Sequence, residues 1–268
     1  MTEFDSTGQT SNLPVPYCFC TLAFGAAYRQ AAKALAAQAE PFGIQVFVAT
    51  DDPADFRDSS NVVAGKVRRT SILYAYNDKR FALAMALEQF ECAVLVDADS
   101  VISGNLPAQL QVMPGMTASV KYTSLETDLQ TYHSRSLPAF TALAKRLQIQ
   151  LSETAWVCEN LIIIRRDQGR ELEFLRAWAF ADRWLGVRHV FQGDAAFIGM
   201  AAKAADWTVQ NDHPAFQQLR QAIVNQGRNT LKPTQRPPFM MWTKRIGFYR
   251  RWLLSGLHTL SAPSQYWF

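Results

Sequence analysis

Two aspartates one residue apart, Asp97 and Asp99, follow an apolar run in the segment LVDADS. Carboxylates at positions i and i+2 can both turn toward one point where a strand gives way to a turn, and such hard oxygen ligands suit Mg²⁺ or Mn²⁺. The alternative is a solvated boundary between a strand and a turn, because Asp and Ser favour turns. The spacing does not decide between them, since a chain with 14 Asp residues often contains one such pair by chance.

The segments around this pair predict an α/β fold with a mostly parallel sheet flanked by helices. Apolar, β-rich runs alternate with segments of strong helix formers, which is typical of a parallel sheet covered by helices. The first predicted strands lie within residues 17–24, 44–53 and 92–99, separated by predicted helices at 26–40 and 77–91. Further along, the pattern predicts a strand at 161–164, helices at 171–184 and 194–207, and a short strand at 207–210.

Polar residues close three of these strands, at Thr21, at Thr50 with Asp51, and at Asp97 with Asp99. In parallel α/β sheets, ligands bind outside the carboxyl ends of the strands. We therefore expect these side chains to line one binding edge of the sheet.

The lengths of a predicted helix and of the strand after it place one basic residue, Arg80, at the same edge. A helix from Arg80 to Glu91 rises about 16 Å. The strand that follows runs back a similar distance to Asp97. Arg80 is therefore expected beside the two aspartates, where helix N-termini also favour anions. This layout suits a metal-bound diphosphate.

The composition is that of an ordinary globular protein, with 49% apolar and 19% charged residues in a chain of 268. The excess of 27 Lys and Arg over 23 Asp and Glu is too small to argue for a nucleic-acid partner. No run of about 18 apolar residues predicts a transmembrane helix. The four cysteines lie in or beside apolar runs without a C-x-x-C pair, which favours buried free thiols in a reducing compartment. We expect a cytoplasmic protein.

Three parts are expected along the chain: a leader at 1–16, a catalytic domain at 17–234 and an arm at 235–268. The leader is polar and lacks the apolar core of a signal peptide. The arm mixes aromatic and basic residues. It either contacts anionic lipid at the inner face of a membrane or, as such segments do more often, packs its aromatics on the domain.

Five segments resemble a nucleotide-sugar-dependent glycosyltransferase of the GT-A fold, nearest to glycosyltransferase family 8, the group of glycogenin and bacterial lipopolysaccharide glucosyl- and galactosyltransferases. They are TLAFGAAYRQAAKALAAQ, VFVATDDP, KRFALAMALEQFECAVLVDADSVI, VCENLIIIRR and FQGDAAFIG. The resemblance covers roughly residues 17–210. That family has an Arg just before the helix leading into its Asp-x-Asp strand, and here this is Arg80, 17 residues before Asp97.

The resemblance implies a metal-dependent hexosyltransferase that moves a sugar from a UDP-sugar to an acceptor hydroxyl of a glycan or glycolipid, in cell-surface glycan or lipopolysaccharide synthesis. It implies that Asp97 and Asp99 ligate Mn²⁺ or Mg²⁺ on the UDP diphosphate and that Arg80 touches the donor sugar or phosphate. The residues that it places near the base or ribose are Thr21, Tyr28 and Asp51. It also implies that Asn160 contacts the sugar and that Asp194 lies near the reacting carbon.

Other interpretations of these residues stay open. Asp194 precedes a helix and could be its N-cap, Asp51 could belong to a turn, and Tyr28 could pack in the core. By contrast, Glu159 and Asn160 interrupt an apolar strand, and buried polar groups need partners, so we include both among the catalytic candidates.

The sequence departs from the family at three places. Asn160 is followed by Leu-Ile rather than Ala-Gly, and Asp194 by Ala rather than Gln. The late His-x-x-Gly-x-x-Lys-Pro-Trp segment is not cleanly present, which leaves His258, or alternatively His213, as the third metal ligand. Retention or inversion at the sugar therefore stays open.

Two other functions fit the same scaffold. A sugar-phosphate nucleotidyltransferase would carry a Gly-rich basic loop after the first strand, and TLAFGAAYRQ is poor in Gly. A non-catalytic sugar-nucleotide or glycan-binding module would keep the sheet edge without the chemistry.

Overall fold

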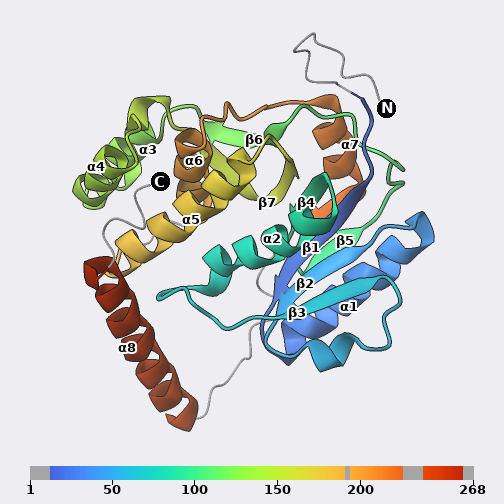
Figure 1. Ribbon diagram of the computed structural model, residues 1–268, viewed down its shortest axis with the longest axis horizontal. Helices are drawn as coiled ribbons and strands as arrows, with labels where there is room; N and C mark the ends of the chain where they lie inside the picture. The colour runs from blue at the N-terminus through green and yellow to red at the C-terminus, as the bar shows by residue number, and fades with distance from the viewer. Residues whose placement is uncertain (1–12, 191–193, 226–237, 262–268) are drawn as a thin grey trace, which may run out of the picture.

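A six-stranded sheet with helices on both faces forms the body of the protein (Figure 1). The computed structural model describes residues 13–190, 194–225 and 238–261, and in the last of these ranges it describes side chains for 246–257. The sheet strands are β1 (Tyr17–Ala23), β2 (Val46–Thr50), β3 (Val62–Lys66), β4 (Cys92–Val96), β6 (Gly115–Tyr122) and β7 (Trp156–Arg165). The helices are α1 (Ala26–Ala39), α2 (Lys79–Gln89), α3 (Leu125–Tyr132), α4 (Leu137–Arg146), α5 (Arg170–Gly186), α6 (Asp194–Ala204), α7 (Pro214–Ala222) and α8 (Pro238–Ser261).

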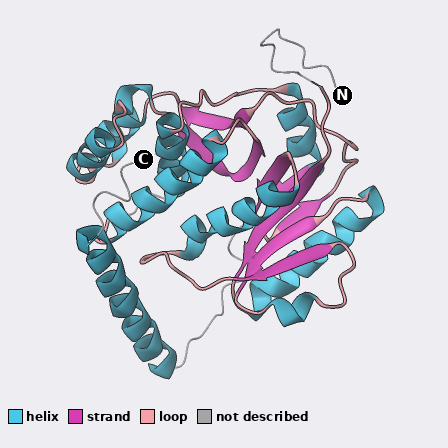
Figure 2. Ribbon diagram, in the orientation of Figure 1, coloured by secondary structure: helices cyan, strands magenta, loops and turns pink. Residues whose placement is uncertain are grey.

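The strand order is β3-β2-β1-β4-β7-β6, with β3, β2, β1 and β4 paired in parallel. β7 runs antiparallel to both of its neighbours, β4 and β6. This confirms the predicted α/β fold with a mostly parallel sheet flanked by helices (Figure 2). A separate two-stranded sheet pairs β5 (Ser100–Ile102) with β8 (Ile223–Asn225).

The reversed direction of β7 matters for the carboxyl edge of β4. Val96, the last residue of β4, pairs with Leu161 in the middle of β7. The first half of β7, residues 156–160, therefore extends past the end of β4. There it overhangs the loop that carries Asp97 and Asp99.

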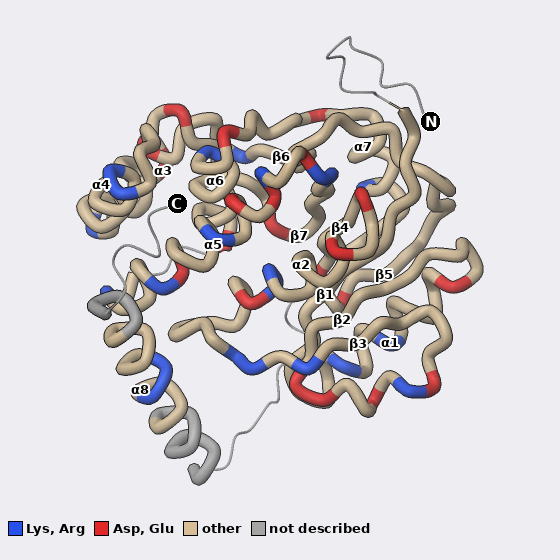
Figure 3. The backbone as a smooth tube through the Cα atoms, in the orientation of Figure 1, with Lys and Arg blue, Asp and Glu red and all other residues tan. Residues whose placement is uncertain are grey.

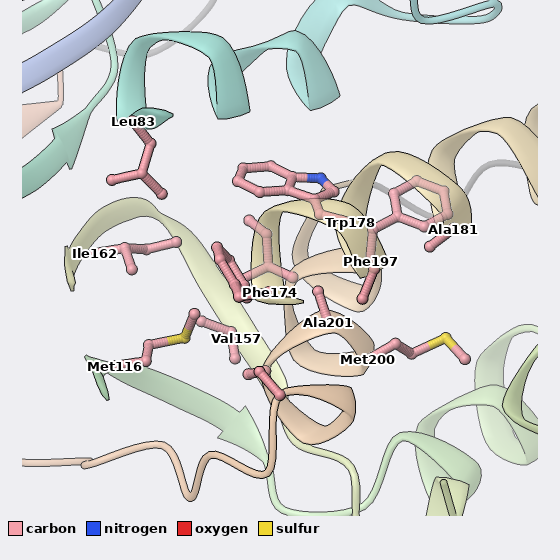
Figure 4. Close-up of a cluster of buried hydrophobic side chains, with 14 of the residues drawn as sticks. Leu83, Met116, Val157, Ile162, Phe174, Trp178, Ala181, Phe197, Met200 and Ala201 are labelled. Carbon is pink, nitrogen blue, oxygen red and sulfur yellow. The ribbon is translucent and has the colours of Figure 1, made fainter. Parts of the chain in front are cut away.

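Two apolar cores lie on opposite faces of the sheet, because alternate residues of each strand point to opposite sides. One core joins the sheet to α1 and α7, and the other joins it to α2, α5 and α6. Figure 4 shows part of the second core, in which Trp178 and Phe174 of α5 and Phe197 of α6 gather on one side of Leu83 of α2 and Ile162 of β7. β4 is buried along its whole length, as expected of a strand covered on both faces.

Most predicted elements are present with small shifts of their ends. α1 ends just before Pro41 and α2 begins just after Asp78, near the boundaries that the sequence predicts. The predicted strand at 207–210 is reduced to an isolated bridge between Gln210 and Thr117. The sequence pattern did not predict β3, β6, α3, α4 or α7, nor the small β5–β8 sheet, and it predicted an arm rather than a helix where α8 lies.

The described residues nearest to the two ends of the chain pack on the rest of the protein. Residues 1–12 of the predicted leader lie outside the described residues, but Val15 is buried and pairs with Leu110. At the other end, α8 lies along the edge of the molecule beyond α5 (Figure 1). Among the described helices, none has the length and apolar character needed to cross a bilayer.

All four cysteines are free thiols, as the sequence predicts. Cys18, Cys20 and Cys92 are buried, and Cys158 is half-buried. Burial raises the pKa of the Cys18, Cys20 and Cys92 thiols, so these three side chains stay neutral and act as small apolar residues of the core.

Candidate active site

A buried lysine joins two aspartates at the carboxyl edge of the sheet. Lys79 Nζ lies 2.6 Å from Asp97 Oδ1 and 3.1 Å from Asp194 Oδ2. The Asp194 side chain is fully buried, while that of Asp97 is 23% exposed, so the group is open to solvent on the Asp97 side. Burial alone would lower the pKa of Lys79, but Asp194 and Asp97 raise it above its ordinary value. Lys79 is therefore a fixed positive charge at this edge.

Three elements bring these side chains together. Asp97 follows the last residue of β4, Lys79 opens α2, and Asp194 opens α6. α6 can approach β7 closely because residue 199 is Gly, where a Cβ atom would lie 1.8 Å from the Ala155 carbonyl oxygen. This close packing sets how far α6 extends toward the sheet, and with it the position of Asp194.

Glu159 adds a third carboxylate to this group. The pairing of β7 with β6 shifts register between Ala118 and Val120, so residues 158–161 bulge from the ladder. Bulges turn side chains away from their regular direction and are common beside active sites. Burial, then Asp194 and Asp97, raise the pKa of Glu159, against a lowering effect of Lys79. The Glu159 carboxylate is therefore a stronger base than that of an ordinary glutamate.

Asn225 holds the other oxygen of Asp97. Its Nδ2 donates a 2.7 Å hydrogen bond to Asp97 Oδ2. The β5–β8 sheet makes this contact possible, because Asn225 pairs with Ser100, three residues after Asp97. Asp97 is thus held from both sides, by an ammonium on one oxygen and an amide on the other.

A cavity of about 110 Å³ lies beside Asn225. Its lining residues are Ser100, Ser119, Cys158, Asn160, Leu161, Phe216, Arg220, Ile223 and Asn225. Ser100 is 3% exposed, and its hydroxyl has no hydrogen-bond partner among the residues that the structure describes. Two amides, two hydroxyls and a guanidinium offer donors and acceptors of the kind that sugar hydroxyls require.

Arg80, predicted to lie beside Asp97, has other partners. Its guanidinium donates to the Asn77 carbonyl at 2.6 Å and to Thr70 Oγ1 at 2.6 Å, and it lies 3.4 Å from Asp182 Oδ2. Burial lowers the pKa of Arg80 despite Asp182 and Asp78, and burial raises the pKa of Asp182 despite Arg80. The start of α2 does return to the predicted edge, but Lys79 is the residue that faces Asp97. A contact of Arg80 with a donor sugar stays a prediction.

Of the residues predicted near the nucleotide base, Thr21 lies inside β1 two residues before its end, Tyr28 lies on α1, and Asp51 directly follows β2. Thr21 is fully buried, and its hydroxyl has no partner in the described part of the chain. Tyr28 is half-buried on α1 against the core. Burial alone would raise the pKa of Asp51, but hydrogen bonds from the Gly25 N–H and from Arg29 lower it. Asp51 is thus an ionised carboxylate at the start of α1, and a role for these residues in nucleotide binding stays a prediction.

A metal bound at this edge would need ligands from the substrate and water as well as from the protein. Within the described ranges, no three His, Cys, Asp or Glu residues are arranged to hold an ion by themselves. Asp97, partly exposed, and Asp99, half-buried two residues later, supply hard oxygen ligands, so two protein ligands with phosphate oxygens and water suit Mg²⁺ or Mn²⁺.

His258 and His213 are the two candidates for a third metal ligand. The His258 side chain lies outside the described residues. His213 caps α7 by accepting a hydrogen bond from the Ala215 N–H, which gives it a structural role.

Lys79 and Asn225 were missed in the sequence analysis. The length argument that placed Arg80 at the edge applies equally to Lys79, the residue before it, so the lysine could have been named. Asn225 lies 128 residues from Asp97 and follows no recognisable motif, so its position depends on the fold.

Comparisons with known proteins leave the family open. No family model matches the chain, and no curated protein matches its sequence. Among solved structures, the chain is similar to one described as the apo structure of the bifunctional glycosyltransferase WbbM, with a TM-score of 0.43 and 10% identity. The match covers 88% of this chain and 45% of the other, so the chain spans less than half the length of that protein. A likeness this distant carries no conclusion about function.

Proposed function

We propose that this protein is a glycosyltransferase that moves a sugar from a nucleotide-diphosphate sugar, a UDP-sugar in the first instance, to an acceptor hydroxyl. The observation that carries the proposal is the buried ammonium of Lys79, held between Asp97 and Asp194 at the carboxyl edge of a parallel sheet. Ligands of such sheets bind at this edge. A fixed cation beside partly exposed carboxylates suits a diphosphate that arrives with a divalent metal.

Asp97 and Asp99 are the residues that would hold Mn²⁺ or Mg²⁺. The metal would neutralise the charge that develops on the departing diphosphate. Three carboxylates, Asp97, Asp194 and Glu159, interact with the single charge of Lys79, so the group has an excess of negative charge. A divalent cation would balance that excess.

Each of the following site residues has a distinct task in this proposal. Lys79 orients Asp97 and lies ready to pair with a phosphate oxygen as charge grows on it. Asn225 fixes the second oxygen of Asp97. We place the transferred sugar in the cavity that Asn160 and Asn225 line, where amides can bind its hydroxyls. Glu159, with its raised pKa, is suited to accept the proton of the acceptor hydroxyl.

The test is release of nucleoside diphosphate. The protein is incubated with a panel of UDP- and GDP-sugars in Mn²⁺, with and without simple sugar acceptors, and free UDP or GDP is measured. Slow hydrolysis of one donor, abolished in Asp99→Ala and retained in the exposed control Asp58→Ala, supports the transferase. Binding of a donor with no release under any condition identifies a binding module instead, and pyrophosphate release from a nucleoside triphosphate and a sugar phosphate identifies a nucleotidyltransferase.

A further inference from the structure

The C-terminal helix α8 presents an apolar face to solvent. Ile246, Tyr249, Leu253 and Leu254 are 61%, 64%, 56% and 49% exposed. Their spacing of three, four and one residues places them on one side of a helix. Scattered apolar residues are normal at a protein surface, but a contiguous apolar helix face marks an interaction site.

The opposite side of α8 fixes the helix on the body. Ser255 is buried, and Trp252 Nε1 donates a 3.0 Å hydrogen bond to the Val187 carbonyl. The rings of Phe248 and Trp252 stack on His189, with centroids 5.7 Å and 6.3 Å away. Because these contacts hold the inner side, the apolar face points away from the sheet, at the margin of the molecule (Figure 1).

The distribution of acidic and basic residues along the sequence indicates which kind of partner covers the apolar face of α8. All 23 acidic residues of the chain lie before residue 213, whereas eight of its 27 Lys and Arg lie after it. In Figure 3 the described part of α8 carries blue and no red. Arg250, four residues from both Ile246 and Leu254, is exposed within this face, and its long side chain can extend to an anion at the same surface.

We propose that α8 docks this protein on the surface of an anionic lipid bilayer. A helix with an apolar face and only basic charges lies in the membrane interface, with its apolar side among the acyl chains and its cations at the headgroups. Tyr249 fits the same level, because its ring is apolar and its hydroxyl is polar. A second copy of the chain is a poorer occupant, since pairing two such helices would bring like charges together. The proposal does not depend on glycosyl transfer.

Co-flotation of the full chain with vesicles tests the proposal. Vesicles of phosphatidylcholine with about 30% phosphatidylglycerol are compared with phosphatidylcholine alone, at about 0.1 M and about 1 M salt. We expect the partition coefficient to be at least about tenfold higher on the anionic vesicles at low salt and to fall at high salt. The combined Ile246→Ser and Leu253→Ser substitutions are expected to lower it at least about tenfold.

Leu172→Ser is the matched control, since Leu172 is 53% exposed on α5 and its loss is expected to leave vesicle binding unchanged. Circular dichroism checks that each variant is folded. Equal partition of the wild type on the two kinds of vesicle, or unchanged binding of the double variant, would overturn the proposal. A wild-type dimer without vesicle binding, dissociated by the same double substitution, would assign the face to a second copy and would also overturn it.

Discussion

The ammonium of Lys79 lies 3.1 Å from a carboxylate oxygen of Asp194, although 115 residues separate the two in the chain. The same ammonium contacts Asp97, so it joins the start of α2, the end of β4 and the start of α6. These three elements meet only in the folded protein. The site is therefore a product of the sheet topology, and its stability and its chemistry depend on the same contacts.

We expect Lys79→Met to lower the free energy of unfolding by about 3–5 kcal/mol, because it leaves the buried Asp194 without its counter-charge. Adding Asp194→Asn should restore part of the loss, since the two side chains are coupled. Urea denaturation of the two single variants and the double variant measures this coupling. The exposed pair Lys203 and Glu153, at 2.8 Å, is the control and should couple by less than about 1 kcal/mol. Equal coupling in both pairs would contradict a buried ion pair at the site.

Arg80→Met is expected to destabilise the protein to a similar degree, about 3–5 kcal/mol, by taking the charge of Arg80 away from the buried Asp182. The exposed Arg176→Met is the control, expected to change stability by less than about 0.5 kcal/mol. Thermal and urea unfolding measure both. If Arg80→Met keeps the stability of the wild type and loses only donor binding, the residue belongs to the binding site rather than to this buried network.

We expect Gly199→Ala to displace Asp194, although residue 199 does not itself belong to the site. Its new methyl group would meet the Ala155 carbonyl oxygen, so α6 must move away from β7 and carry Asp194 with it. We expect a loss of stability of about 1–3 kcal/mol from overpacking, together with weaker donor binding. Gly256→Ala is the matched control on α8, where a Cβ atom meets nothing within 4 Å. Calorimetric titration with UDP measures the binding, and unchanged affinity in Gly199→Ala would show that the position of α6 does not matter for it.

Glu159 should make stability depend on pH. Its pKa is raised in the folded protein above the ordinary value of 4.5, so the folded state holds more protons than the unfolded state between the two values. The contribution is complete below pH 4.5 and is lost as pH rises through the folded pKa. The free energy of unfolding of the wild type should therefore fall with rising pH in this window relative to Glu159→Gln. A constant difference between the two proteins across the window would contradict a raised pKa.

The sequence predicts β1, β2 and β4 of the parallel half of the sheet because these strands are largely apolar and are separated by helices. It misses β3, whose residues are only half-buried or exposed. It does not predict the direction of β7, since an apolar strand such as Leu161–Ile164 has the same pattern whichever way it runs. β6 is missed for another reason: its second half mixes polar and apolar residues that are only half-buried, with Lys121 exposed, so pairing with β7 rather than composition makes it a strand.

The sequence likewise predicts only part of the candidate site. Element lengths place the start of α2 beside Asp97, but one residue along a helix turns the side chain by about 100°, so length cannot choose between Lys79 and Arg80. The contact between Asn225 and Asp97 requires β5 and β8 to pair, and those strands have three residues each, too few to carry a pattern.

Calorimetric titration of UDP into the protein, with Mn²⁺ and then with EDTA, tests the central proposal most directly. We expect the dissociation constant of the wild type to be at least about tenfold lower with Mn²⁺, and we expect Asp97→Asn and Asp99→Asn to lose that difference. The exposed control Asp58→Asn should behave as the wild type. Equal affinity of the wild type with and without the metal, or an undiminished metal effect in both site variants, would contradict the assignment of this edge as the donor site.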